Sequence, residues 1–521
     1  MANIPAADGG ATATAACVKH HLKPLLDFAV EKIAAYANPG WQERTTLFVG
    51  ATGGMRSCEA GRKARIEEEI RKFIQEYTGN SNFGAWHYAT IPGAAEGYFG
   101  WVAANYSNPE YFGDPNHPNP GIFDGTKGYL EMGGQSMQVA FPTTSHVLDN
   151  RSHSRRVTIG GTHYNVYARE WKNHGVNAIW KEHMTCVYGD GHDRANANLN
   201  NSPNMDDCLP VGAKVPNYSH GNETGNFFAC IRECFKYIGC ARDECEKLES
   251  VANTCVTTGK RGCLICRLPK HVQQVVHGPG ITGWVGGSNF FHGALGVFND
   301  NDRNNVINDA NGYQPVRLLL GAARLHGGIE VPTWVQRTTR NDAGGVPVAG
   351  AQRHLYEKTA NFLWRAVFLA VYTTVILHKG FGIQIPRTQE NPAGLIDEVI
   401  AALTVDPLIS RINGKNPGQR QEAIDRVLAT FPENLPGTLA NRLTDAVAAP
   451  EADVRAAVLN DVRTAVKPVL EIFLGALATN SGKPYAIMNK PWALGAAVII
   501  ASQDDVTVEF DPYASLKDLV A

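Results

Sequence analysis

Residues 46–56 read TLFVGATGGMR, and they carry the clearest structural signal in the chain. Thr46 to Val49 is a short β-type run that ends in glycine, and an amphipathic helix is predicted to follow over residues 58–77. Backbone N–H groups at such a strand-to-helix junction point outward and suit an anion, usually phosphate. The same glycines also fit a turn that needs them for its geometry alone.

The segments on either side alternate between helix and strand. A helix is predicted before residue 46, because its apolar residues are spaced for one face. These residues are Leu22, Leu25, Leu26, Ala29 and Ile33. Residues 128–132 and 137–141 read as two strands joined by a tight glycine turn, and residues 157–167 read as a second hairpin. This order predicts an α/β lobe.

Two further glycine-rich segments lie inside this lobe. Residues 91–101 surround Glu96, a single acid in an apolar stretch, and burial would raise its pKa and suit it to act as a general base on water. The alternative is a solvent-exposed glutamate in a turn. Residues 133–136 form a turn that would let phosphate approach the backbone, or an ordinary hairpin turn.

Composition excludes several classes of partner. The 521 residues hold 48 Lys and Arg against 50 Asp and Glu, a formal net charge of -2. A near-neutral chain has no overall basic footprint for nucleic acid and no polybasic membrane anchor. The longest apolar run, residues 366–377, is too short to span a bilayer and predicts a buried helix.

Nine of the eleven cysteines lie between Cys186 and Cys266. Such a cluster indicates either disulfides or zinc sites, and disulfides are preferred because Asn-x-Ser/Thr sequons accompany them. The sequons begin at Asn105, Asn150, Asn200, Asn217 and Asn222. Secretion or the lumen of the secretory pathway is therefore expected, with the targeting segment outside this sequence and the cytoplasm as the alternative. Cys17 and Cys58, outside the cluster, are expected to be buried free thiols.

The glycine-rich segments, in this order, resemble the conserved regions of the ecto-nucleoside triphosphate diphosphohydrolase (apyrase) family. Residues 48–56, 93–106 and 129–138 resemble the second, third and fourth regions; residues 284–298 and 489–495 match later ones. The resemblance implies two actin-like (ribonuclease H-like) α/β lobes around a nucleotide cleft. The domains expected from it are lobe I at 1–142, completed by 485–521, and lobe II at 143–385 with the cysteine block 186–266. Apolar residues spaced at three and four predict an all-helical insert at 386–484, outside the resemblance.

The resemblance also implies roles for residues at the matching positions. Glu96 would activate the attacking water, supported by Thr52 and Gln138, in the metal-dependent hydrolysis of nucleoside tri- and diphosphates. Contacts to phosphate are expected of Gly53, Arg56, Gly133, Gly134, Gln135, Ser136 and Met137. Calcium or magnesium would be held mostly through water near Glu131 and Trp492, and Phe291 and His292 are candidates for stacking on the base.

Two departures from the family pattern keep other functions open. The family's first phosphate loop is expected to precede this chain's start, and residues 8–14 imitate it without flanking strands. Glu131 stands where the family has Asp. The alternatives are a truncated or degenerate homologue without catalysis and another actin-like polyphosphate hydrolase. Oligomerisation through the helical insert is also left open.

Overall fold

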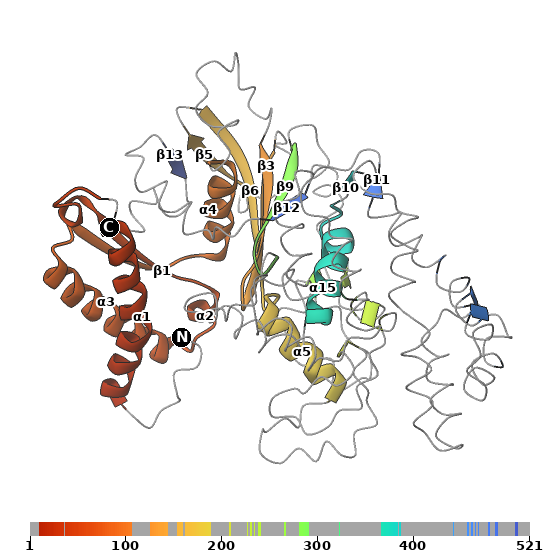
Figure 1. Ribbon diagram of the computed structural model, residues 1–521, viewed down its shortest axis with the longest axis horizontal. Helices are drawn as coiled ribbons and strands as arrows, with labels where there is room; N and C mark the ends of the chain where they lie inside the picture. The colour runs from red at the N-terminus through yellow and green to blue at the C-terminus, as the bar shows by residue number, and fades with distance from the viewer. Residues whose placement is uncertain are drawn as a thin grey trace, which may run out of the picture. The chain divides into compact units, whose positions relative to one another are not determined.

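The computed structural model describes residues 10–35, 37–106, 126–143, 154–159 and 162–188 continuously (Figure 1). Further along it describes residues 281–290 and 366–383, with short segments and single residues elsewhere. The chain divides into two compact units, Met1–Gly175 with Lys490–Ala521, and Val176–Asn489. Strands and helices mix in both units, which confirms the predicted α/β class.

The first unit begins with helices packed on a parallel strand pair. Strands β1 (Thr46–Ala51) and β2 (Ala85–Thr90) pair in parallel, from Thr46 opposite Ala85 to Ala51 opposite Thr90. Helix α3 (Ala60–Ser81) begins where the Glu59 carboxylate accepts hydrogen bonds from the backbone N–H groups of Gly61 and Arg62. Its buried side chains are spaced at four residues, as the sequence predicted. They are Ile66, Ile70, Ile74 and Thr78.

Helix α1 (Gly10–Ala34) confirms the predicted helix, whose apolar face is only partly covered. Val18 and Leu22 are buried against α3, but Leu25 and Ile33 are 66% and 44% exposed. Spacing determines which side chains share a face, whereas the neighbouring element determines how much of that face is covered. The helix also takes in residues 10–14, so this part of the imitated phosphate loop is not a strand hairpin.

An antiparallel sheet forms the larger layer of the first unit (Figure 1). Its strands are ordered β3 (Lys127–Met132), β4 (Ser136–Pro142), β6 (Thr162–Lys172), β5 (Ser154–Ile159) and β13 (Val506–Val508). Both predicted hairpins are therefore confirmed. Because β6 pairs with β4 along seven positions, this unit extends past the boundary expected at residue 142.

Helix α4 (Gly93–Tyr106) packs on this sheet and is buried on every side in its described part. A Cβ atom at Gly97 would lie 3.3 Å from the Cβ of Ala168 and 3.6 Å from that of Ala140. At Gly100 it would overlap the ring of Tyr129. The glycines of this segment therefore let the helix backbone approach the strands closely, which places Glu96 directly over the sheet.

The sequon at Asn105 is not an accessible glycosylation site, which corrects the expectation from the sequence. Asn105 is 0% exposed at the end of α4. Its amide donates to the carbonyls of Trp101 (2.9 Å) and Lys127 (3.1 Å), and its Oδ1 accepts from the N–H of Lys127 (2.8 Å). The side chain thereby ties the helix to the start of β3. The other four sequons lie outside the described residues.

The second unit contains helices α5 (Val176–Tyr188) and α15 (Ala366–Val375), which meet through aromatic rings. The His183 ring stacks on Phe368 with centroids 4.5 Å apart, and Trp180 meets the same ring edge-on. The apolar run near residue 370 is therefore a buried helix, as predicted.

Strands β9 (Gly283–Ser288) and β12 (Tyr485–Ile487) of this unit pair in parallel. Within the described part of the chain, none of the helices combines the length and the apolarity that crossing a bilayer requires.

A disulfide joins Cys208 to Cys230 in this unit, which confirms the preference for cross-links at this pair. Cys234 is a buried cysteine outside the disulfide, and its Sγ lies within 4.8 Å of both bonded sulfurs. Cys17 and Cys58 are free as predicted, although they are only half-buried against the α1–α3 core. Two short strands of the cysteine block, β7 (Ile238–Cys240) and β8 (Ile265–Cys266), pair in parallel with Cys240 opposite Cys266. Most of the remaining block, and nearly all of the expected helical insert, lie outside the described residues.

Replacing Gly100 with Ala should destabilise the first unit, because the added methyl overlaps Tyr129. We expect a loss of about 1–3 kcal/mol in the free energy of unfolding, measured by urea titration. Gly79→Ala, in helix α3, is the matched control, since nothing lies within 4 Å of its Cβ position. This control should gain up to about 1 kcal/mol from helix propensity. Equal effects at the two positions would contradict the packing described for α4.

Candidate active site

The candidate site is built on three strands whose polar side chains stand in one row. In the antiparallel register, Gln138 of β4 lies opposite Glu131 of β3 on one side and opposite Glu170 of β6 on the other. Directly opposed residues present their side chains on the same face of a sheet. Glu131 and Gln138 are buried, at 2% and 0% exposed, so this row brings two acids and an amide into the interior.

Helix α4, which packs on the sheet, brings Glu96 to this row. Glu96 is 4% exposed, so the alternative of a solvent-exposed turn glutamate is wrong. Its Oε2 accepts hydrogen bonds from Nη2 of Arg56 at 2.5 Å and from Nε2 of Gln138 at 3.1 Å. The carboxylate is thus fixed by one charged and one neutral donor.

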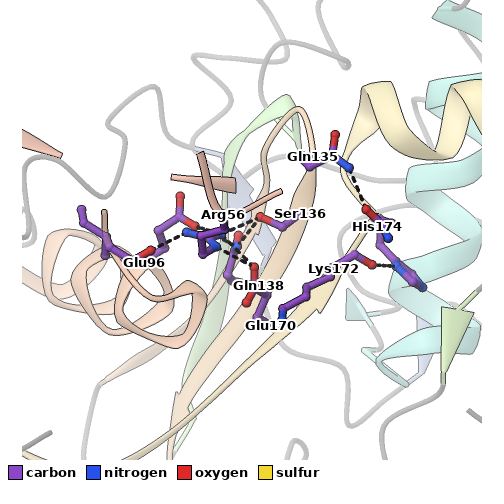
Figure 2. Close-up of polar contacts among 10 residues, drawn as sticks. Arg56, Glu96, Gln135, Ser136, Gln138, Glu170, Lys172 and His174 are labelled. Carbon is purple, nitrogen blue, oxygen red and sulfur yellow. Dashed lines mark hydrogen bonds and ion pairs between the residues drawn. The ribbon is translucent and has the colours of Figure 1, made fainter. Parts of the chain in front are cut away.

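Arg56, at the end of the short helix α2 (Gly53–Arg56), connects the members of the site. Its Nη2 contacts Glu96, Ser136 Oγ (3.0 Å) and Glu170 Oε1 (2.8 Å), and its Nε donates to the same oxygen of Glu170 (3.1 Å). Its Nη1 donates to the carbonyl of Ile91 at 2.6 Å. Figure 2 shows the guanidinium group among these partners.

All three glycine-rich segments of the first unit therefore meet at one place. Arg56 comes from the first, Glu96 from the second and Ser136 from the third. A Cβ atom at Gly53 would lie 2.9 Å from Ser136 Oγ, so only glycine lets α2 come this close to the turn between β3 and β4.

The pKa of Glu96 is raised to about 8. The largest cause is burial, which disfavours the charged carboxylate. Arg56 lowers the pKa, whereas the neighbouring charges of Glu131 and Glu170 raise it further. A pKa in this range is the property that the sequence argument required of a general base.

One buried hydrogen-bond acceptor beside Glu96 is left open by the part of the chain that the structure describes. Gln138 uses its Nε2 to reach Glu96 and Ser136, while its Oε1 is buried without a hydrogen-bond partner among the described residues. A buried carbonyl oxygen of this kind normally accepts a hydrogen bond. Ser136 Oγ accepts from both Arg56 and Gln138, so its own hydrogen is left to donate.

Other residues named from the sequence lie near this cluster without joining it. Met137 is fully buried on the opposite face of β4, because side chains alternate along a strand. Gln135 donates to Asn173 at 2.7 Å, away from Arg56 (Figure 2). The backbone carbonyl of Thr52 accepts from Met55 and Arg56 at the start of α2.

The glycine turn itself is closed by its backbone, since the Gly133 N–H donates to the carbonyl of Ser136 at 2.9 Å. Gly134 is half-buried beside it. Trp492, Phe291 and His292 lie outside the described residues.

Glu170 is the site residue that the sequence argument did not single out. It follows Tyr164, Val166 and Ala168 at alternate positions of β6, and all three are buried. This pattern could have identified Glu170 from the sequence. An acid at the next alternate position after three buried residues is unusual, because such a position normally holds an apolar side chain.

The donor set fits a hard divalent cation. Two carboxylates, Glu96 and Glu170, pair with one guanidinium group, and the charge of Glu131 also acts on Glu96, so the described cluster carries excess negative charge when they are ionised. Carboxylate and amide oxygens are the ligands that calcium and magnesium prefer, and Gln138 Oε1 is a buried oxygen of this kind. Glu131 is held in place by a hydrogen bond from the Tyr129 hydroxyl to its Oε2 at 2.8 Å.

Comparison with known proteins agrees with this geometry. The sequence profile of the GDA1/CD39 (nucleoside phosphatase) family matches residues 11–263, which hold every residue of the cluster. Probable apyrase 3 of Arabidopsis thaliana is 26% identical over 237 residues, which cover 42% of this chain and 45% of that protein. Golgi apyrase of Schizosaccharomyces pombe is 29% identical over 176 residues, 32% of this chain and 28% of that protein.

A mouse relative and a solved structure complete the comparison. Ectonucleoside triphosphate diphosphohydrolase 3 of Mus musculus is 27% identical over 193 residues, 36% of this chain and 33% of that protein. The chain therefore spans less than half the length of these relatives. A crystal structure of nucleoside triphosphate hydrolases from Neospora caninum aligns with 69% of this chain and 72% of its own, at 11% identity and a TM-score of 0.36. The predicted resemblance is confirmed: residues 11–263 match the GDA1/CD39 (nucleoside phosphatase) family.

Proposed function

We propose that the chain hydrolyses the terminal phosphate of nucleoside tri- and diphosphates. The observation that carries this proposal is the buried cluster in which Glu96, with its raised pKa, lies beside the unpartnered Oε1 of Gln138. This pairing supports a water molecule that donates one hydrogen to Gln138 and gives its other proton to Glu96. The named activities of the apyrase and diphosphohydrolase relatives supply the substrate class.

The residues around Glu96 have separate roles in this reaction. The water oxygen bonds to the terminal phosphorus, the bond from that phosphorus to the bridging oxygen breaks, and Glu96 takes the proton of the water. The Ser136 hydroxyl, whose acceptor positions are filled by Arg56 and Gln138, donates to a phosphate oxygen. The products are the shortened nucleotide and inorganic phosphate.

Glu131 and Gln138 would hold a calcium or magnesium ion, mostly through water. When bound, such an ion neutralises the charge of the phosphate groups and of the transition state. Its presence would offset the excess of carboxylates over guanidinium in the cluster. Thr52, Gly53 and the glycine turn at residues 133 and 134 remain proposed phosphate contacts, and Trp492, Phe291 and His292 remain proposed contacts to cation and base.

We also propose that the chain works in an oxidising compartment of the secretory pathway. The Cys208–Cys230 disulfide supports this location, because such cross-links persist where thiols are not kept reduced. The Golgi apyrase of fission yeast is named for such a compartment. The actin-like two-lobed arrangement is proposed on the same family basis. The helical insert at residues 386–484 is proposed from its apolar residues at helical spacing.

Phosphate release from ATP and ADP, with calcium or magnesium, tests the activity. Glu96→Gln keeps the shape of the side chain and removes the base, so kcat should fall by about 10²–10⁴-fold. Glu76→Gln, at an exposed position of α3, is the control and should leave the rate unchanged. Equal rates of phosphate release for the wild-type chain and Glu96→Gln would contradict the proposal.

Stability should depend on pH through Glu96 whether or not the chain is active. The folded pKa of about 8 exceeds the ordinary value of 4.5, so the stabilisation from Glu96 is complete below pH 4.5 and is lost as the pH rises to 8. Relative to Glu96→Gln, the wild-type chain should lose on the order of a few kcal/mol over this window, with no further change above it.

Urea unfolding at pH 5, 7 and 9 measures this difference. The gap between Glu96→Gln and the wild-type chain should widen in favour of the variant as the pH rises, while Glu76→Gln follows the wild type. A gap that stays constant across the three pH values would show that the pKa of Glu96 is not raised.

A further inference from the structure

Glu170 has no role in the hydrolysis described above, yet it makes the most extensive contact with Arg56. Two donors of the guanidinium group, Nε at 3.1 Å and Nη2 at 2.8 Å, reach the same oxygen of Glu170. The side chains of Arg56 and Glu170 are 14% and 13% exposed, so the pair is largely removed from solvent. A charged pair shielded in this way holds its geometry better than one at the surface.

The place of the Glu170 carboxylate is built into the fold. A Cβ atom at Gly93, the first residue of α4, would overlap all three atoms of that carboxylate group. The register of β6 on β4 sets Glu170 directly opposite Gln138. The missing side chain of Gly93 and the register of β6 together provide the space that the Glu170 carboxylate occupies.

The Nη2 atom of Arg56 lies near more acceptor oxygens than it has hydrogens to donate. It carries two hydrogens, but three oxygens lie within 3.0 Å of it: Glu96 Oε2, Ser136 Oγ and Glu170 Oε1. Glu170 therefore competes with Glu96 for the same nitrogen. Without Glu170, the guanidinium group would be free to rotate and donate two parallel hydrogen bonds to the Glu96 carboxylate. This bidentate geometry is the one that arginine favours with carboxylates.

We propose that Glu170 is a positioning residue: it holds Arg56 so that a single guanidinium nitrogen reaches Glu96, and leaves the rest of the Glu96 carboxylate to the water beside Gln138. This inference rests on the proposed function, because it assigns to Glu96 the role of base. Glu170 acts through Arg56 and does not touch the substrate. Its loss should therefore slow the reaction without weakening substrate binding.

The test is a double-mutant cycle on kcat and KM for ATP hydrolysis, using the full chain. Glu170→Gln removes the charge and keeps the shape, and it should lower kcat about tenfold with KM within about twofold of the wild type. Arg56→Lys removes the guanidinium fork. In the Arg56→Lys background, Glu170→Gln should have no further effect, because the two residues act as one unit.

Glu67→Gln is the matched control, since Glu67 is also a partly buried acid of the first unit, paired with Lys63 and bonded by Thr90 at 2.5 Å. It should change neither constant. If Glu170→Gln does not fold, as judged by circular dichroism, the cycle is run with Glu170→Asp, which keeps the charge on an arm too short for both donors.

The outcomes separate this inference from the proposed function. An active chain in which the two substitutions lower kcat independently would overturn the role of Glu170 alone. So would an unchanged kcat, or a rise in KM at constant kcat, which would make Glu170 a contact for substrate or cation. A wild-type chain no faster than Glu96→Gln overturns the proposed function, and the positioning role fails with it.

Discussion

The ion pairs of Arg56 with Glu96 and Glu170 are the constraint on which the candidate site depends. Carboxylates removed from water are costly unless a charge or hydrogen-bond donors compensate them. Here one guanidinium group serves two acids and a serine, and its Nη1 is tied to the backbone at Ile91. Breaking a buried pair by removing one partner typically costs about 3–5 kcal/mol, so Arg56 links the folding of this region to its chemistry.

The packing of α4 makes this arrangement possible. Its glycines face Glu170, Ala168 and Tyr129, so the helix backbone lies directly on the sheet and Glu96 reaches the row formed by Glu131, Gln138 and Glu170. A side chain at any of these glycines would lift the helix away from the strands. The close approach that brings Glu96 to its partners also excludes water from it, which is why its pKa is raised.

Much of the fold and part of the site could be predicted from the sequence. The helix at α3 and both hairpins agree with local spacing and composition, because these features depend on near neighbours in the chain. Leu25 and Ile33 of α1 are exposed although they share a face with the buried Leu22, and the sequon at Asn105 is inaccessible. In both cases the exposure of the side chain depends on whether another element packs over it, and local sequence spacing carries no information about that contact.

By itself, the sequence determined the glycine-rich segments, their order and the residue types that suit hydrolysis, because turns and periodicity are local properties. Tertiary structure alone decided that Arg56 pairs with Glu170, 114 residues further along the chain. It also decided that Gln138 lies opposite Glu131 on one side and opposite Glu170 on the other. Strand register sets both results: a shift by one residue would exchange the two faces of β4 and β6 and leave Glu96 without its partners.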